Sequence, residues 1–279
     1  MERAPGTCIL CGCQNRSLLF QKEEWTVFRC CHCGLAFLDP RPTQAELGTL
    51  YKQCYFHEQY GQGLAVESLE MRRRISQEDH RVKFFRPYKK NGRVVDCGCG
   101  LGYFLHACRF YGYDVSGVDI SDYASSYVKD VLRIPIQVGG VDEIQFENAS
   151  IDVVTMWHFL EHTSNPRDYL KQVALWLKPG GLLVVDVPNY RGTDAQKYGN
   201  HWVGWQVPYH LFHFTPETIK DLLAACGFIT IRTKDYHSEY IKNSLKRISG
   251  ISLFARLIAK GFSGTSYAVV ARKTGSSSK

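Results

Sequence analysis

Residues 94–102 read VVDCGCGLG, and this stretch decides which fold the chain is expected to adopt. A short apolar run ends at Asp96, a glycine-rich turn follows, and residues 103–111 have the pattern of a helix. The glycines let the backbone turn sharply and let a ligand approach main-chain amides. The turn lacks both the G-x-G-x-x-G spacing of a dinucleotide site and the Gly-Lys-Ser/Thr ending of a P-loop. An acid beside it suits a cationic amino-acid ligand better than a pyrophosphate.

Strand and helix patterns alternate on the C-terminal side of this turn. Such alternation is typical of a parallel sheet that is covered by helices on both faces. The expected strands are 93–97, 114–119, 134–138, 151–157, 182–187, 228–235 and 267–272. The expected helices are 103–111, 121–132, 165–177 and 216–226, with Ser121 and Thr215 as N-caps.

The second expected strand ends in GVDIS at residues 117–121, which places Asp119 at its carboxyl end. An acid at that position can accept hydrogen bonds from both hydroxyls of a ribose. The alternative is that Asp119 only stabilises the turn or caps the next helix.

Six short motifs in unbroken order resemble those of class I S-adenosylmethionine-dependent methyltransferases, over about residues 90–235. They are DCGCG at 96–100, Asp119, IDVV at 151–154, LEH at 160–162, LKPGG at 177–181 and VPN at 187–189. The resemblance implies an α/β, Rossmann-like methyltransferase fold, with a parallel sheet plus one antiparallel edge strand. It also implies S-adenosylmethionine as the cofactor.

The resemblance further implies a set of cofactor-binding residues. The glycine loop would contact the methionine part, the second strand the ribose and adenine, and the end of the fourth strand the reactive methyl group. A residue after the third strand would meet the adenine edge, although no Asp stands at position 140 as it often does in the family. The implied residues are Asp96, Gly98, Cys99, Gly100, Asp119, Ile120, Val141 or Asp142, and Trp157.

Six of the eleven cysteines lie in the first 33 residues. Such crowding favours a metal site over a disulfide framework. Cys8-x-x-Cys11 and Cys30-x-x-Cys33 form two knuckles, each followed by a glycine, and four thiolates at this spacing make a closed, structural Zn²⁺ site. The choice of ligands stays open because other candidates lie nearby, namely Cys13, Cys31 and His32.

This cysteine-rich head resembles the N-terminal zinc-ribbon region of one methyltransferase branch. That branch contains sugar C-methyltransferases and enzymes of glycan and natural-product biosynthesis. The resemblance implies that the head covers the acceptor site and that Tyr55 or Tyr60 closes over the cofactor. The net charge of +7 allows an anionic partner, and an RNA methyltransferase that grips RNA with the head is the alternative. The head carries no dense Lys/Arg stripe, which disfavours that alternative.

Methyl transfer needs the acceptor to be held in line and its proton removed. Candidate bases are His210, then His162, then Tyr209, because histidine titrates near neutral pH and aromatic residues with histidines suit a pocket for a ring or a sugar. Alternatively, Glu161 or His162 only orients its own loop. The long loop at 201–215, which is rich in aromatic residues and histidines, can likewise have only a structural role, with His213 capping the next helix. The expected acceptor is a sugar, a lipid-linked glycan or a secondary metabolite, methylated on oxygen or carbon.

The expected organisation has five parts: a zinc-binding head (1–45), a helical connector or lid (46–90), a methyltransferase domain (91–272), a basic helical insertion within it (241–262) and a disordered tail (273–279). The insertion can lie on an acidic membrane or bind a lipid-linked acceptor. We favour the alternative, a helical lid or a dimer surface packed on the sheet. The first residues lack the apolar stretch of a signal peptide and no apolar run could cross a bilayer, so a cytoplasmic location is expected.

Overall fold

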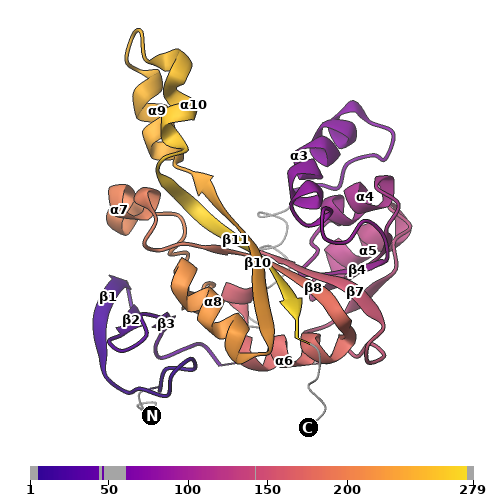
Figure 1. Ribbon diagram of the computed structural model, residues 1–279, viewed down its shortest axis with the longest axis horizontal. Coiled ribbons are helices and arrows are strands. Elements are labelled where there is room, and N and C mark those ends of the chain that lie inside the picture. The colour runs from indigo at the N-terminus through magenta and orange to yellow at the C-terminus, as the bar shows by residue number, and fades with distance from the viewer. Residues whose placement is uncertain (1–5, 44–45, 47–60, 142, 275–279) are drawn as a thin grey trace.

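A computed structural model describes residues 6–43, 46, 61–141 and 143–274, and its centre is a seven-stranded sheet (Figure 1). The strand order is β10-β11-β8-β7-β4-β5-β6. Strands β4 to β8 pair in parallel, whereas β11 pairs antiparallel with both β8 and β10. This confirms the predicted fold class. The strands are β4 (Arg93–Cys97), β5 (Asp114–Asp119), β6 (Ile136–Val138), β7 (Ile151–Trp157), β8 (Leu177–Pro188), β10 (Phe228–His237) and β11 (Ser263–Lys273).

Successive side chains of the central strands enter two different cores, because neighbouring residues of a strand point to opposite faces. Val94 and Val153 pack with one group of helices, and Val95 and Val154 pack with the other. The first group is α3 (Leu69–Phe85), α4 (Tyr103–Phe110) and α5 (Asp122–Asp130). The second group is α6 (Pro166–Trp176) and α8 (Pro216–Ala225). The sheet is therefore buried on both faces, as the apolar strands predicted.

The predicted helix starts are confirmed at two positions. The hydroxyl of Ser121 accepts a hydrogen bond from the amide of Ala124, and Thr215 forms a capping box with Thr218 at the start of α8. His213 does not cap α8, since it lies inside β9 (Phe212–His213). β8 begins earlier than expected, at Leu177, because Leu177 already pairs with Ile151 before the register shifts.

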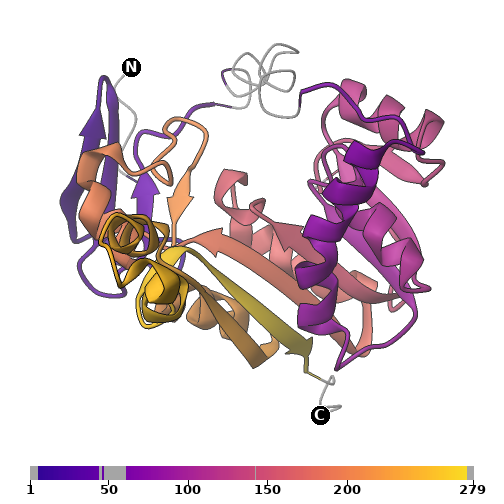
Figure 2. The same ribbon diagram turned by 90° about the horizontal axis from the view of Figure 1, so that it is seen from above.

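The head forms a second, four-stranded sheet in the order β1-β2-β3-β9. Its strands are β1 (Arg16–Lys22), β2 (Trp25–Cys30), β3 (Ala36–Leu38) and β9. β9 belongs to the long loop after β8, so this loop and the head share one sheet. Figure 2 shows the head sheet and α3 on opposite sides of the molecule, with the central sheet between them. Buried head residues such as Val27 and Leu35 join the same core as α6 and α8.

The remaining elements lie in the loops. They are the short helices α7 (Thr193–Tyr198), α9 (Glu239–Lys246) and α10 (Ala255–Ala259), and the 3-10 turns η1 (Leu160–His162), η2 (Gly199–His201) and η3 (Ser252–Phe254). α9 and α10 project beyond the ends of β10 and β11 instead of lying on a face of the sheet (Figure 1). Among the described residues, no helix has the length and apolar content needed to cross a bilayer.

Candidate active site

A cavity of about 550 Å³ opens at the carboxyl ends of β4, β7 and β8. This edge of a parallel sheet is where ligands bind in open α/β folds. One part of its wall is the glycine loop with Trp157, a second is α3, and a third is formed by His162 and the loop after α7. The polar and charged wall residues are Arg74, Glu78, Arg81, Asp96, His158, His162, Gln206, His210 and Thr265.

The glycine loop is held between β4 and β5 by main-chain contacts. The amides of Gly98 and Cys99 donate to the carbonyl of Val118, at 2.8 and 3.2 Å. Gly98 has φ +71°, and a Cβ there would lie 2.5 Å from a ring carbon of Phe159. A side chain is therefore excluded for two reasons, backbone strain and lack of space. Gly98, Cys99 and Gly100, which are predicted to contact the cofactor, all line the cavity.

Asp96 presents a buried carboxyl group to the cavity. It is 3% exposed and accepts a hydrogen bond of 2.6 Å from the hydroxyl of Thr155. Burial, opposed by this hydrogen bond, raises the pKa of Asp96 to about 7. Its carboxyl group makes no ion pair with any described residue. A buried acid without a cation partner is suited to a ligand that carries positive charge.

Asp119 lies behind the glycine loop and is not one of the described residues that line the cavity. Its two carboxylate oxygens accept hydrogen bonds from the amides of Gly100 (2.7 Å) and Ser121 (2.9 Å). Each oxygen keeps acceptor capacity for a further donor. Ile120 is 50% exposed beside it. Asp119 thus fixes the loop, which is the structural role that the sequence left open, and contact with a ribose stays a prediction.

The remaining predicted cofactor residues are distributed differently. Trp157 lines the cavity, and its indole nitrogen has no hydrogen-bond partner among the described residues. Val141 is buried in the core that contains Val118 and lies away from the described cavity wall. Asp142 and the tyrosines 55 and 60 lie outside the described residues.

A charged face of α3 lines the cavity and was missed from the sequence. Glu78 is 2% exposed and forms ion pairs with Arg74 and, at 2.9 Å, with Arg81. The guanidinium of Arg81 also lies 4.9 Å from the ring centroid of Trp157. Residues at this spacing share one face of a helix, so the sequence could have indicated that these three charged side chains lie together.

Three titratable side chains follow β7. Glu161 is fully buried, and neither of its oxygens accepts a hydrogen bond from a described residue. His158 lies between two acids, with Nδ1 3.4 Å from Glu161 and Nε2 3.8 Å from Asp186. Burial lowers the pKa of His158, but the two acids outweigh it and the net shift is upward. Burial would raise the pKa of Glu161, but the surrounding imidazoles lower it to about 2. The two neighbouring acids therefore favour the protonated form of His158.

His162 and His210 meet in the cavity wall from opposite sides. Their ring centroids are 4.6 Å apart and the rings are almost perpendicular. Nδ1 of His210 lies 2.8 Å from the carbonyl of Gly204, and Nδ1 of His162 lies 3.1 Å from the carbonyl of Tyr209. A carbonyl only accepts, so Nδ1 of His210 carries the hydrogen and Nε2 carries a lone pair. Burial lowers the pKa of both histidines, to about 3 for His210.

The third predicted base, Tyr209, contributes its main chain to this arrangement. Its carbonyl fixes His162, and its side chain is not part of the described cavity wall. His213 is buried in β9, and neither of its ring nitrogens has a hydrogen-bond partner among the described residues.

The head supports the loop that carries His210. Besides the pairing of β3 with β9, Phe20 of the head stacks on Trp205 of the loop, at 4.6 Å between centroids and 5° between planes. The hydroxyl of Tyr190 donates to the carbonyl of Gly34 at 2.5 Å. The position of His210 therefore depends on the head, although no head residue belongs to the described cavity wall.

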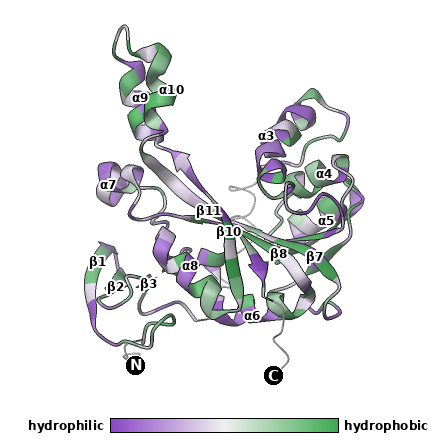
Figure 3. Ribbon diagram, in the orientation of Figure 1, coloured by the Kyte–Doolittle hydropathy of each residue, from purple (hydrophilic) through white to green (hydrophobic). Residues whose placement is uncertain are grey.

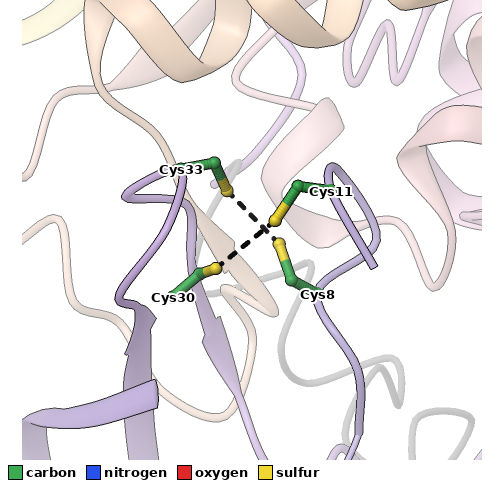
Figure 4. Close-up of side chains that lie close together, drawn as sticks. All are labelled: Cys8, Cys11, Cys30 and Cys33. Carbon is green, nitrogen blue, oxygen red and sulfur yellow. Dashed lines mark hydrogen bonds between the residues drawn. The ribbon is translucent and has the colours of Figure 1, made fainter. Parts of the chain in front are cut away.

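The four knuckle cysteines form one compact group (Figure 4). Sγ of Cys8 lies 3.4 Å from Sγ of Cys33, Sγ of Cys11 lies 3.5 Å from Sγ of Cys30, and all four sulfurs lie within 4.8 Å of one another. Tetrahedral Zn²⁺ with bonds of about 2.3 Å requires sulfurs about 3.8 Å apart, so the group fits this ion. Cys13 and Cys31 are outside the group, which narrows the ligand choice that the sequence left open.

Comparison with known proteins places the chain in a family. A family model described as a methyltransferase domain matches residues 69–233, more than half of the chain. The chain therefore belongs to the methyltransferase-domain family, within the class I S-adenosylmethionine-dependent methyltransferases. A Mycolicibacterium smegmatis protein named a probable S-adenosylmethionine-dependent methyltransferase is 30% identical over 173 residues, or 60% of this chain and 62% of that protein. The ubiquinone biosynthesis O-methyltransferase of Coxiella burnetii is 32% identical over 114 residues, or 39% of this chain and 48% of that protein.

The alignments thus span 48% to 62% of the length of these two relatives. Among solved structures, an S-adenosylmethionine-dependent methyltransferase from Archaeoglobus fulgidus aligns with a TM-score of 0.56 and 23% identity, over 71% of this chain and 94% of that one. The cyclase SpnF aligns with a TM-score of 0.60 and 18% identity, over 85% of this chain and 98% of that one. These identities show the fold alone. Because a protein named a cyclase shares the fold, the reaction has to be argued from the site.

Proposed function

We propose that the protein transfers a methyl group from S-adenosylmethionine to a small-molecule acceptor, with His210 as the general base. The observation that carries the proposal is the position of His210, in the wall of the same cavity as Asp96 and with Nδ1 fixed by the carbonyl of Gly204. The acceptor class is a sugar, a lipid-linked glycan or a secondary metabolite. The acceptor atom is oxygen or carbon.

The residues at the strand ends fit the cofactor. Asp96 would bind the amino group of the cofactor's amino-acid part, and the glycine loop would pack against that part. Asp119 and Ile120 would hold the ribose and adenine, and Trp157 would lie beside the reactive methyl. The family places further contacts at Val141 or Asp142 and at Tyr55. The cofactor, when bound, supplies an electrophilic methyl group.

His210 is suited to take a proton from the acceptor. Its low pKa keeps the ring neutral at pH 7, so Nε2 can accept a hydrogen bond from an acceptor hydroxyl. The buried carboxylate of Glu161 lies close enough to His162 and His210 to stabilise positive charge that develops on them, since ligand atoms of all three lie within 4.8 Å of one another. His162, which also lines the cavity, is the next candidate for the same role, ahead of Tyr209. An imidazole base favours a hydroxyl oxygen as the methylated atom.

Transfer of labelled methyl groups tests the acceptor class. The protein is incubated with S-adenosylmethionine labelled in the methyl group and with a cell extract divided into metabolite, lipid and RNA fractions. We expect label in the metabolite or lipid fraction, unaffected by ribonuclease and absent when His210→Gln replaces the wild type. Label confined to RNA would establish the RNA methyltransferase alternative and overturn the proposal.

We also propose that the four cysteines bind a structural Zn²⁺. Four thiolates fill every position of a tetrahedral ion, so the site would fold the head and leave no position for a substrate. Metal analysis should find one zinc per chain in the wild type and in Cys31→Ser, whose exposed sulfur is outside the group. Cys30→Ser should lose the metal. Equal zinc in both variants would refute this ligand set.

A further inference from the structure

The hairpin of α9 and α10 is a largely exposed part of the chain. It connects β10 with β11 and projects away from both sheets (Figure 1). α9 has no buried residue, and α10 buries only Ala255 and Ala259. The hairpin therefore contributes little to the core of the protein.

Large apolar side chains are exposed along this hairpin. Leu253 is 90% exposed, Leu257 66%, Phe254 58% and Ile258 41%. Figure 3 shows hydrophobic residues on the projecting α10, far from the apolar strands of the core. Removing apolar surface from water is favourable by about 25 cal/mol for each Å², so covering these side chains would contribute to the free energy of binding a partner.

Apart from Glu239 at the start of α9, every charged residue of the hairpin is basic. No Asp or Glu occurs between residues 241 and 262. Four exposed basic residues take part in no ion pair within the described ranges; they are Lys246, Arg247, Arg256 and Lys260. A surface that combines uncompensated cations with apolar side chains matches the interface of a bilayer containing anionic lipid.

The base of the hairpin is fixed to the catalytic domain by one buried acid. The carboxylate of Asp194, in α7, accepts hydrogen bonds from the hydroxyl of Ser238, from the amides of Glu239 and Tyr240 (both 3.2 Å) and from the hydroxyl of Thr265 (3.1 Å). Thr265 also lines the cavity. The hairpin is therefore anchored at its base, next to the cavity wall.

We propose that the α9–α10 hairpin docks the protein on the surface of a bilayer that contains anionic lipid. Leu253, Phe254 and Leu257 enter the boundary between headgroups and acyl chains, and the four basic residues contact the anionic headgroups. The docked hairpin holds the cavity close to the membrane through Asp194 and Thr265. This inference does not depend on which acceptor is methylated.

Flotation with lipid vesicles tests the proposal on the full chain. Vesicles of phosphatidylcholine alone are compared with vesicles containing 30% phosphatidylglycerol, at low and moderate salt (about 0.05 and 0.15 M). We expect flotation with the anionic vesicles that weakens as salt rises, and little with phosphatidylcholine. Leu253→Ser/Phe254→Ser and Lys246→Glu/Arg247→Glu should each lower the partition coefficient at least tenfold.

Matched controls separate the hairpin from general surface properties. Leu18→Ser/Phe110→Ser removes two apolar side chains that are 62% and 73% exposed elsewhere, and Lys22→Glu/Lys129→Glu reverses two exposed charges elsewhere. Both controls should float like the wild type, and every variant should bind S-adenosylmethionine normally. No flotation of the wild type with either vesicle, or equal loss in the controls, would overturn the proposal. So would a wild-type dimer in sedimentation that Leu253→Ser/Phe254→Ser dissociates, since the hairpin would then cover a second copy.

Discussion

The two halves of the cavity are built in different ways. The proposed cofactor half consists of the glycine loop with Asp96 and of Trp157, which line the cavity, with Asp119 behind the loop. All of these lie at or just after the ends of neighbouring parallel strands. The histidine half consists of His162 and His210, which come from the turn after β7 and from a loop that shares a sheet with the head. The cofactor half is thus fixed by the central sheet, and the histidine half by packing between the sheet and the head.

This difference indicates which substitutions should affect cofactor binding and which should affect methyl transfer. A change in the cofactor half should weaken binding of S-adenosylmethionine, and a change in the histidine half or in its support by the head should slow transfer while leaving that binding intact.

The largest expected effect is on turnover, from His210→Gln. Loss of a general base typically lowers a rate by about 10²- to 10⁴-fold, so kcat should fall by this amount in a steady-state assay with the identified acceptor. The affinity for S-adenosylmethionine should stay within about twofold. The control is His201→Gln, an exposed histidine in η2, which should keep wild-type kcat. An unchanged kcat in His210→Gln would remove His210 from the mechanism.

The next effect is on cofactor binding, from Asp119→Ala. Loss of the acceptor for the ribose and of the hydrogen bond to Gly100 should raise Kd at least about tenfold, or about 1.4 kcal/mol, in equilibrium dialysis with labelled S-adenosylmethionine. Asp122→Ala, an exposed acid in the first turn of α5, is the matched control and should bind normally. If Asp119→Ala unfolds, Asp119→Asn replaces it in the same assay. Wild-type affinity in a folded variant would contradict the assignment.

The pH dependence of cofactor binding sharpens the role of Asp96. Because burial raises its pKa to about 7, the carboxyl group is mostly neutral at pH 6 and mostly ionised at pH 8. The cationic cofactor binds the ionised form better, so its affinity should rise by about tenfold from pH 6 to pH 8. Asp96→Asn, which is neutral at both values, should show no such rise. An equal rise in wild type and Asp96→Asn would assign the pH dependence to another group.

The smallest effect concerns the support of the histidine half by the head. Tyr190→Phe removes the hydrogen bond to the carbonyl of Gly34, which should lower the free energy of unfolding by about 1 kcal/mol in urea denaturation. It should also lower kcat modestly without changing cofactor affinity. Tyr198→Phe, on an exposed tyrosine of α7, is the control. Weaker cofactor binding in Tyr190→Phe alone would show that the two halves are coupled.

The sequence predicted the places of the glycine loop, Asp96 and Asp119 at the strand ends and the grouping of the four cysteines, because these features are set by short local spacings. Asp96 and Asp119 lie at the carboxyl ends of β4 and β5, whose apolar residues are recognisable in the sequence. The two C-x-x-C knuckles, each followed by a glycine, specify one cluster of four sulfurs. Gly12 and Gly34 have φ of +72° and +81° there, which only a glycine adopts without strain.

The other features of the site depend on contacts between segments that are far apart in the sequence. No local pattern shows that His210 faces His162, that β9 extends the head sheet, or that Arg74, Glu78 and Arg81 face the cavity. In the basic insertion at 241–262, the apolar residues recur at helical spacing, which led to the expectation of a helix packed on the sheet. Its exposed Leu253 and Leu257 became visible only once the hairpin was seen to project beyond β10 and β11.

The most direct test of the division is isothermal titration of S-adenosylmethionine into three proteins in one buffer: the wild type, Asp119→Ala and His210→Gln. The division of the cavity into two halves predicts binding by the wild type, a Kd at least about tenfold higher for Asp119→Ala, and a Kd within about twofold of the wild type for His210→Gln. Equal weakening by both substitutions, or no binding by a well-folded wild type, would contradict it.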